Sequence, residues 1–308
     1  MRVAKAESQP ANSRTVRPQS GDTRAGFFYA LGAYLLWGFL PLYLKLLQDI
    51  DAFEVMAHRA FWSLPVAGVV LWLVGRTGDV LPTLKNPKKL GILFMTAVII
   101  SANWTVYVWA ISVERTIEAA LGYYINPLIT VAMGAVFLGE RFTRAQVIAL
   151  ALAAIAVLLL TVRGGVFPWV SLALAVSFAL YGFLRKTVDV GPSQGFLVEV
   201  MLLAPFALAF IVWREASGQG SFFEGASYTA LLLGCGPVTA APLILYAFGV
   251  KGLRLSTVGL MQYIAPTLIF LTGLLVFREP FSFWQAVAFV MIWIALAIYT
   301  WSALRKPA

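Results

Sequence analysis

Residue types that commonly carry out catalysis are scarce in this chain of 308 residues. It has one histidine, His58, and one cysteine, Cys235, and it shows neither a phosphate-binding glycine loop nor carboxylates at metal-ligand spacing. Cys235 has no intrachain partner, which excludes a disulfide or a cysteine metal cluster. We therefore expect no enzyme activity, no metal and no cofactor.

Polar and aromatic residues inside long apolar stretches are better candidates for function. A polar group inside lipid is costly unless it is paired or solvated, so such groups usually face the interior of a bundle. Tyrosine and tryptophan add stacking faces and hydrogen-bond donors. Together they predict an aromatic-lined, moderately polar cavity for a small amphiphilic solute. The predicted cavity residues are Tyr34, Trp37, Asn103, Trp104, Tyr107, Tyr123, Asn126, Tyr181, Tyr246, Gln262 and Tyr263.

Charged and titratable residues form a second candidate set, for gating or coupling. Arg59 and Glu199 are separated by the same 140 residues that separate two prolines, Pro65 and Pro205. We expect gate ion pairs at these positions, with Glu118 and Glu199 as acidic partners. Simpler interpretations remain open. The lysines can extend to the membrane surface, the asparagines can form interhelical hydrogen bonds, and the histidine can be a packing residue. The set is Lys45, His58, Arg59, Glu118, Arg185 and Glu199.

Prolines recur at equivalent positions in the apolar stretches. Pro65 pairs with Pro205, and Pro127 pairs with Pro266. Proline removes a backbone donor and frees a carbonyl, which is tolerated in a membrane where the site is buried in protein or lines a wet cavity. The pairs predict helix breaks that act as hinges near a shared binding region. A static kink is the alternative for any single proline.

The composition is that of a membrane protein. Of the residues, 60% are hydrophobic and 12% are charged, with a mean hydropathy of +0.83. The net charge of +9 comes from short basic clusters between apolar runs, which argues against a continuous nucleic-acid-binding face. The lipid bilayer and a small-molecule substrate are the expected partners.

The apolar runs predict an all-α protein with ten membrane-spanning helices joined by short connections. Residues 1–26 are polar and read as a disordered cytoplasmic tail. The predicted spans are 27–47, 55–74, 90–112, 118–138, 145–162, 168–184, 196–213, 227–249, 256–277 and 283–301.

Basic residues give the orientation, because lysine and arginine resist translocation. With the amino terminus inside, seventeen lie in inner segments and four in outer loops. We therefore expect both termini in the cytoplasm and an inner-membrane location.

An internal repeat divides the chain into two five-helix halves, 27–162 and 168–301. Residues 118–149 align without gaps on 257–288 at an offset of 139, with nine of 32 positions identical. The identical residues include the rarer types Tyr, Pro, Glu and Gln. An odd number of spans per half places the second half upside down, an arrangement typical of transporters that rock around a central site.

The strings Glu118–Leu128 and Leu138–Phe142, with His58-Arg59 and Asn103-Trp104, resemble the EamA family of the drug/metabolite transporter superfamily. The likeness runs from about residue 26 to 302. It implies ten helices in two EamA repeats and a central cavity lined mainly by spans 1–4 and 6–9. Spans 5 and 10 would be peripheral supports or homodimer contacts. The family's association with chloramphenicol sensitivity does not establish a substrate.

These observations favour a secondary transporter that moves a small metabolite or drug-like solute by alternating access, with proton coupling as one option. The alternative is a channel or a membrane-embedded interaction protein without an active transport cycle.

Overall fold

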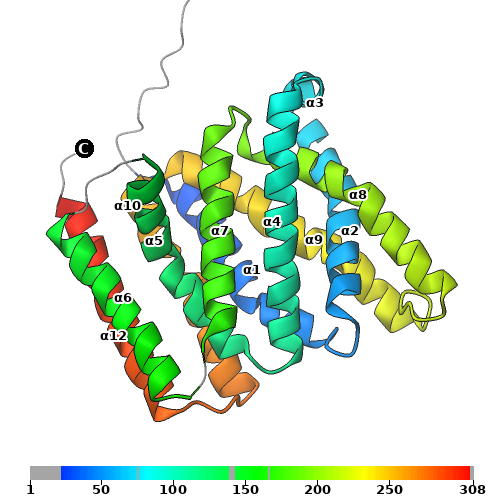
Figure 1. Ribbon diagram of the computed structural model, residues 1–308. Helices are drawn as coiled ribbons and strands as arrows, with labels where there is room; N and C mark the ends of the chain where they lie inside the picture. Colours follow the sequence, from blue (N-terminus) through cyan, green and yellow to red (C-terminus); the bar gives the residue numbers. More distant parts are fainter. Residues whose placement is uncertain (1–21, 74, 76, 139–142, 166, 306–308) are drawn as a thin grey trace, which may run out of the picture.

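The computed structural model describes residues 22–305 except 74, 76, 139–142 and 166, and these residues form an all-helical bundle (Figure 1). Most of the predicted tail and the Glu140 region therefore lie outside the described residues. The helices are α1 Arg24–Lys45, α2 Ala52–Leu73, η1 Thr77–Asp79, α3 Val80–Leu84, α4 Pro87–Ser112, α5 Thr116–Leu138, α6 Arg144–Val162, α7 Trp169–Thr187, α8 Pro192–Ala216, α9 Ala226–Gly249, η2 Val250–Gly252, α10 Leu255–Met261, α11 Ile264–Leu271, the π-helical turn η3 Thr272–Val276 and α12 Phe283–Arg305.

Nine helical segments of the described residues are long and apolar enough to cross a membrane. The chain is therefore a multi-pass membrane protein. The predicted fourth span corresponds to α5, which has 23 residues but is not one of the nine. The ten-span count thus stays a prediction.

The first helix begins at Arg24, earlier than the expected residue 27, because polar groups just before it are held in place. Thr23 accepts a hydrogen bond from the Gly26 amide at 3.1 Å and so caps α1. Asp22 accepts bonds from the Arg254 amide and the Thr257 hydroxyl, both at 2.7 Å. Residues 22–26 therefore belong to the folded part of the chain.

The packing partners come in pairs related by the repeat. α5 packs on α7 as α11 packs on α1, and α9 packs on α1 and α2 as α4 packs on α7 and α8. The equivalent helices α2 and α8 contact each other, as do α6 and α12. This symmetry supports the proposed division of the chain into two halves.

Two similar capping boxes begin α6 and α12. Thr143 and Gln146 exchange hydrogen bonds of 2.8 and 3.3 Å at the start of α6. Ser282 and Gln285 do the same at 2.7 and 3.2 Å before α12. Each box satisfies two amide donors that a helix start leaves unpaired. The two helices then lie side by side at one edge of the bundle (Figure 1).

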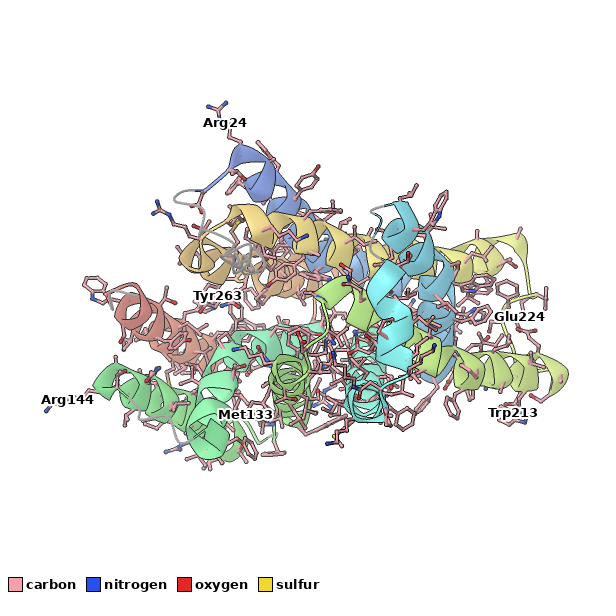
Figure 2. The ribbon with its side chains drawn as sticks, turned by 90° about the horizontal axis from the view of Figure 1, so that it is seen from above. Arg24, Met133, Arg144, Trp213, Glu224 and Tyr263 are labelled. Carbon is pink, nitrogen blue, oxygen red and sulfur yellow. The ribbon has the colours of Figure 1, made fainter. Side chains whose placement is uncertain are left out.

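The bundle is elongated when seen end-on. Figure 2 places Arg144, at the start of α6, near one edge, and Trp213 and Glu224, from α8 and the loop before α9, at the opposite edge. Helices α1, α2, α4, α7 and α9 lie between these edges and carry most of the predicted cavity residues.

The prolines do not break their helices as expected. Helices α2, α5 and α8 run without interruption through Pro65, Pro127 and Pro205. Only the helix near Pro266 is divided, between α10 and α11. One missing hydrogen bond can be absorbed within a long, well-packed helix.

The two proline pairs also differ in burial, and the placement of both near a shared binding region stays a prediction. Pro65 and Pro205 are exposed on the bundle surface, whereas Pro266 is buried and Pro127 is half-buried. The first pair lies on the sides of α2 and α8 that neighbouring helices leave uncovered.

Candidate functional site

Arg59 is a buried cation of α2. Its side chain lies among α2, α4 and α9 with an exposed fraction of 4%. Its Nε donates a hydrogen bond to the Thr239 hydroxyl at 3.1 Å, and its guanidinium lies 5.0 Å from the centre of the Trp104 ring. Within the described residues its Nη1 has no hydrogen-bond partner, and no carboxylate forms an ion pair with it.

Tyrosine side chains from three further helix positions surround this cation. Tyr43, Tyr107 and Tyr123 each interact electrostatically with Arg59, as does Cys235. The rings of Tyr107 and Tyr123 meet edge to face at 5.6 Å. The hydroxyl of Tyr107, a residue that is 3% exposed, has no hydrogen-bond partner among the described residues. The structure thus brings together the predicted residues Arg59, Trp104, Tyr107 and Tyr123.

Glu199 is the corresponding buried acid in the second half. Its side chain is 1% exposed and forms an ion pair of 3.5 Å with Arg185 Nε. It also accepts hydrogen bonds from the Thr96 hydroxyl at 2.7 Å and the Tyr181 hydroxyl at 3.1 Å. The cluster joins α4, α7 and α8. These bonds to both carboxylate oxygens hold three helices in one arrangement as long as the acid stays charged.

A third group consists of the aromatic residues Tyr34, Trp37 and Tyr246 from α1 and α9. Their ring centres are 5.6 to 5.9 Å apart. The Tyr34 hydroxyl lies 3.5 Å from the Val258 carbonyl at α10. These three predicted cavity residues pack on one another, with Met261 and Ala265 beside them.

The two asparagines hold helices together. Asn103 donates to the Leu174 carbonyl at 3.1 Å and to the Ser177 hydroxyl at 2.8 Å. Asn126 donates to the Ala175 carbonyl at 3.1 Å. Both side chains therefore fasten α4 and α5 to α7, which is the plainer of the two readings.

Gln262 and Tyr263 lie at the junction of α10 and α11, away from the Arg59 cluster. The Tyr263 hydroxyl lies 3.4 Å from the Thr300 hydroxyl of α12. Figure 2 shows Tyr263 near this helix. Tyr263 therefore contacts α12, the tenth predicted span.

The remaining gate candidates have local partners. Glu118 forms a two-bonded pair with Arg115, with distances of 2.7 and 2.8 Å, so it is not the partner of Arg59 in this arrangement. Lys45 lies 3.5 Å from Glu114. Arg115 lies three residues before Glu118 at the start of α5. Side chains at this spacing lie close together, which explains why Glu118 pairs with Arg115.

His58 is a packed histidine. Its Nδ1 accepts a hydrogen bond from Trp62 Nε1 at 3.0 Å, and its ring stacks on Phe222 with centres 5.1 Å apart. This arrangement agrees with the packing interpretation of the residue.

Several buried polar residues were missing from the predicted set, among them Thr239, the partner of Arg59, and the three that follow. Glu54 is 1% exposed, pairs with Arg214 at 3.0 Å and accepts the Ser221 amide at 2.7 Å. Glu279 accepts the Thr116 and Ile117 amides at 2.8 and 2.9 Å and so caps α5. Thr96 binds Glu199. The match of Glu279 with Glu140 in the repeat was the one signal that singled out any of them.

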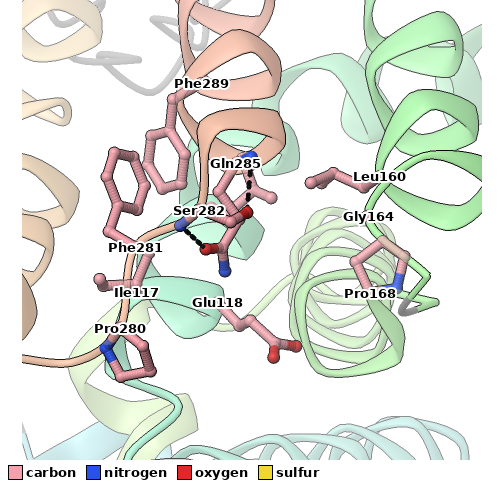
Figure 3. A pocket seen from close by; sticks show the side chains of 11 residues that line it. Ile117, Glu118, Leu160, Gly164, Pro168, Pro280, Phe281, Ser282, Gln285 and Phe289 are labelled. Atoms are coloured by element: carbon pink, nitrogen blue, oxygen red, sulfur yellow. Dashed lines mark hydrogen bonds between the residues drawn. The ribbon is translucent and has the colours of Figure 1, made fainter.

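A pocket of about 400 Å³ lies between the start of α5, the end of α6 and the start of α12 (Figure 3). Glu118 and Gln285 contribute polar groups, and Leu160, Phe281 and Phe289 contribute apolar ones. None of the predicted cavity residues lines it. The pocket therefore lies apart from the three clusters described above.

Comparisons with known proteins give the family. The sequence model of the EamA-like transporter family matches residues 24–162. A RarD protein of Streptomyces exfoliatus is 42% identical, over 92% of this chain and 90% of that protein. An uncharacterized transporter of Vibrio cholerae is 37% identical over 94% and 96%. A chloramphenicol-sensitive protein RarD of Pseudomonas aeruginosa is 33% identical over 92% and 97%.

One solved crystal structure shares the fold. It is 21% identical and superposes with a TM-score of 0.59 over 92% of this chain and 99% of that one. The relatives over nearly the full length are membrane transporters rather than enzymes. The chain therefore belongs to the EamA-like transporter family, as one of its RarD-like members.

Proposed function

We propose that this protein is a proton-coupled secondary transporter of the inner membrane that moves a small metabolite or drug-like solute by alternating access. Both termini lie in the cytoplasm, and two inverted halves of five helices rock against each other. The observation that supports this most is the direct packing of the equivalent helices α2 and α8, which carry buried charges of opposite sign, Arg59 and Glu199. Charges at such depth are retained in membrane proteins mainly for function.

The Glu199 cluster is the proposed coupling site and inner gate. Arg185 comes from the last turn of α7, which is the cytoplasmic end in the proposed orientation. Its guanidinium also contacts the carbonyls of Gly191 and Pro192 at 3.4 Å. Protonation of Glu199 removes its attraction to Arg185. Helices α7 and α8 are then free to separate.

Contacts at the opposite end keep the proposed periplasmic side closed in this arrangement. Glu54 of α2 binds Arg214 of α8, and Glu279 caps α5 across the interface between the halves. Rocking towards that side requires these bonds to break while the inner cluster, which is also formed in this arrangement, stays intact. Alternating access is the exchange between these two sets of contacts.

Proteoliposomes containing a pH-sensitive dye test the coupling. We would impose an inward proton gradient and add amino acids, small carboxylates and chloramphenicol in separate experiments. A solute that accumulates against its gradient and moves protons supports the proposal. Proton-independent, downhill flux of every solute that crosses would instead identify a channel.

Variants sharpen this experiment. Glu199→Gln keeps the shape of the side chain and one of its two acceptor oxygens but cannot carry the proton. We expect proton-driven accumulation to be lost while solute exchange without a gradient persists. Glu224→Gln, at an exposed loop position, is the matched control and leaves both readouts unchanged.

A further inference from the structure

The buried charges Glu199 and Arg59, at equivalent positions of the two halves, have different partners. Glu199 is paired with Arg185, which follows the Tyr181–Leu184 string of α7. The matching string in α1, Trp37–Leu40, is followed by Pro41, which has no charge. Arg59, at the position equivalent to Glu199, therefore lacks the counter-charge that the second half provides.

The residue that a neighbouring helix places beside each buried charge also differs between the two halves. Thr96, which donates to Glu199, is separated by the repeat offset of 139 residues from Cys235, which lies beside Arg59. The buried charge of the first half, Arg59, is therefore opposite in sign to Glu199. No acid of the described residues pairs with it. The two carboxylates that we expected as partners are engaged by Arg115 and Arg185.

Two buried donors point to what completes the cluster. Arg59 Nη1 and the Tyr107 hydroxyl both lack hydrogen-bond partners among the described residues, on side chains that are 4% and 3% exposed. A buried cation without an anion is costly, and unpaired buried donors add to that cost. Tyr107 follows Trp104 by three residues on α4, and the Trp104 ring lies against the guanidinium, so we expect an anionic group with two acceptor oxygens to reach both donors. A carboxylate has that geometry.

Aromatic rings set the rest of the ligand's chemistry. Trp104 lies over the guanidinium, and Tyr123 packs against Tyr107. Flat rings beside a charged anchor favour a solute with an aromatic or apolar body next to its carboxylate.

We propose that Arg59 and Tyr107 bind the carboxylate of a transported aromatic or apolar monocarboxylate, while Trp104 and Tyr123 contact its body. This inference rests on the proposed transport function and names the substrate class of its central site. It also explains why the halves share a scaffold but differ at this position: Arg185 neutralises Glu199, and the solute neutralises Arg59.

Calorimetric titration of the purified, detergent-solubilised protein tests the site without requiring transport. The probes are benzoate, its neutral isostere benzamide, and chloride as the sodium salt. We expect benzoate to bind at least tenfold more tightly than benzamide, and chloride to compete weakly. Equal binding of benzoate and benzamide would overturn the proposal. So would full displacement of benzoate by chloride at equal concentration, which would identify a halide site.

Variants tie the binding to the two donors. Arg59→Gln is expected to weaken benzoate binding by tenfold or more, and Tyr107→Phe by about threefold to tenfold, the range of one hydrogen bond. Arg163→Gln, at the exposed residue that follows α6, is the control and keeps wild-type affinity. Size-exclusion profiles and melting temperatures establish that each variant is folded. If Tyr107→Phe is folded and binds benzoate as tightly as the wild type, the proposed site is wrong.

The outcomes also separate this inference from the transport proposal. Arg59-dependent benzoate binding without any concentrative flux leaves the site standing and removes the transporter mechanism. Proton-driven flux of a neutral solute that is unchanged in Arg59→Gln does the reverse.

Discussion

At the scale of single residues, the buried carboxylates hold distant helices together. Glu54 lies in α2, yet its partners Arg214 and Ser221 lie at the end of α8 and in the following loop. A carboxylate that is 1% exposed needs such partners, because its desolvation is otherwise uncompensated.

Glu54→Gln should therefore lower the melting temperature of the detergent-solubilised protein. The amide keeps the size of the side chain but leaves Arg214 without its counter-charge, and we expect a loss of about 1–3 kcal/mol in the free energy of unfolding. Thermal unfolding followed by intrinsic fluorescence measures the shift. Glu224→Gln, at an exposed position, should melt with the wild type. Identical melting of all three proteins would show that the pair contributes nothing.

The contact of Asp22 with Arg254 and Thr257, at the edge of the fold, is expected to depend on pH. The Arg254 amide lowers the pKa of its carboxyl below the ordinary value of 3.8, with help from the Thr257 hydroxyl. A lowered folded-state pKa means that the contact stabilises fully above pH 3.8 and is lost as the pH falls through the lower, folded value. Asp22→Asn removes the charge at neutral pH.

Hydrogen exchange of a peptide covering 250–262 tests this contact. We expect faster exchange in Asp22→Asn than in the wild type at pH 7, because the Arg254 amide loses its charged acceptor. Asp189→Asn, at another exposed position, should exchange like the wild type in this peptide. Unchanged protection in Asp22→Asn would mean that the start of α10 is held without the carboxylate.

At the scale of elements, the fourth helix of each half has a different form. The first is the continuous helix α5, whereas the second is divided into α10, α11 and the π-helical turn η3. Proline is present at the equivalent position of both. We therefore expect the second half to carry the flexible joint.

Pro266→Ala supplies an amide that can bond to the Gln262 carbonyl and join α10 to α11. One added hydrogen bond should slow amide exchange in this region by about fivefold to tenfold. We also expect slower solute exchange in proteoliposomes, because the joint becomes stiffer. Pro205→Ala, in the uninterrupted and exposed part of α8, is the control and should change neither rate. Faster exchange at 262–266 in Pro266→Ala would contradict a hinge there.

At the scale of the whole molecule, the inverted arrangement depends on α5 crossing the membrane. Five helices, α4 to α8, separate Lys88 from Glu224, and both positions are exposed. If all five span, the two positions lie on opposite sides. If α5 does not span, they lie on the same side.

Single cysteines at these positions, in a Cys235→Ala background, distinguish the two topologies. An impermeant maleimide should label Glu224→Cys in intact spheroplasts and Lys88→Cys only in inverted vesicles. Labelling of both from the same side would remove the inverted repeat. The opposite pattern would keep the repeat but reverse the proposed orientation.

The sequence by itself determined the features that depend on local patterns. Apolar runs of sufficient length determine the helices, and the pairs Thr143–Gln146 and Ser282–Gln285 form the two capping boxes. Repeated residues at an offset of 139 indicated which helices are equivalent. The match of Arg59 with Glu199 in the repeat singled out one buried charge of α2 and one of α8, but not Glu54.

Only the tertiary structure decided what each of these side chains touches. Thr96 and Glu199 are 103 residues apart, so no local spacing predicts their bond. Pro65 and Pro205 match in sequence but lie on exposed faces, because helix rotation sets which side meets a neighbour. Glu118 pairs with Arg115, and no acid of the described residues pairs with Arg59. Helix formation follows from short-range periodicity, whereas the partner of a buried charge follows from how whole helices pack.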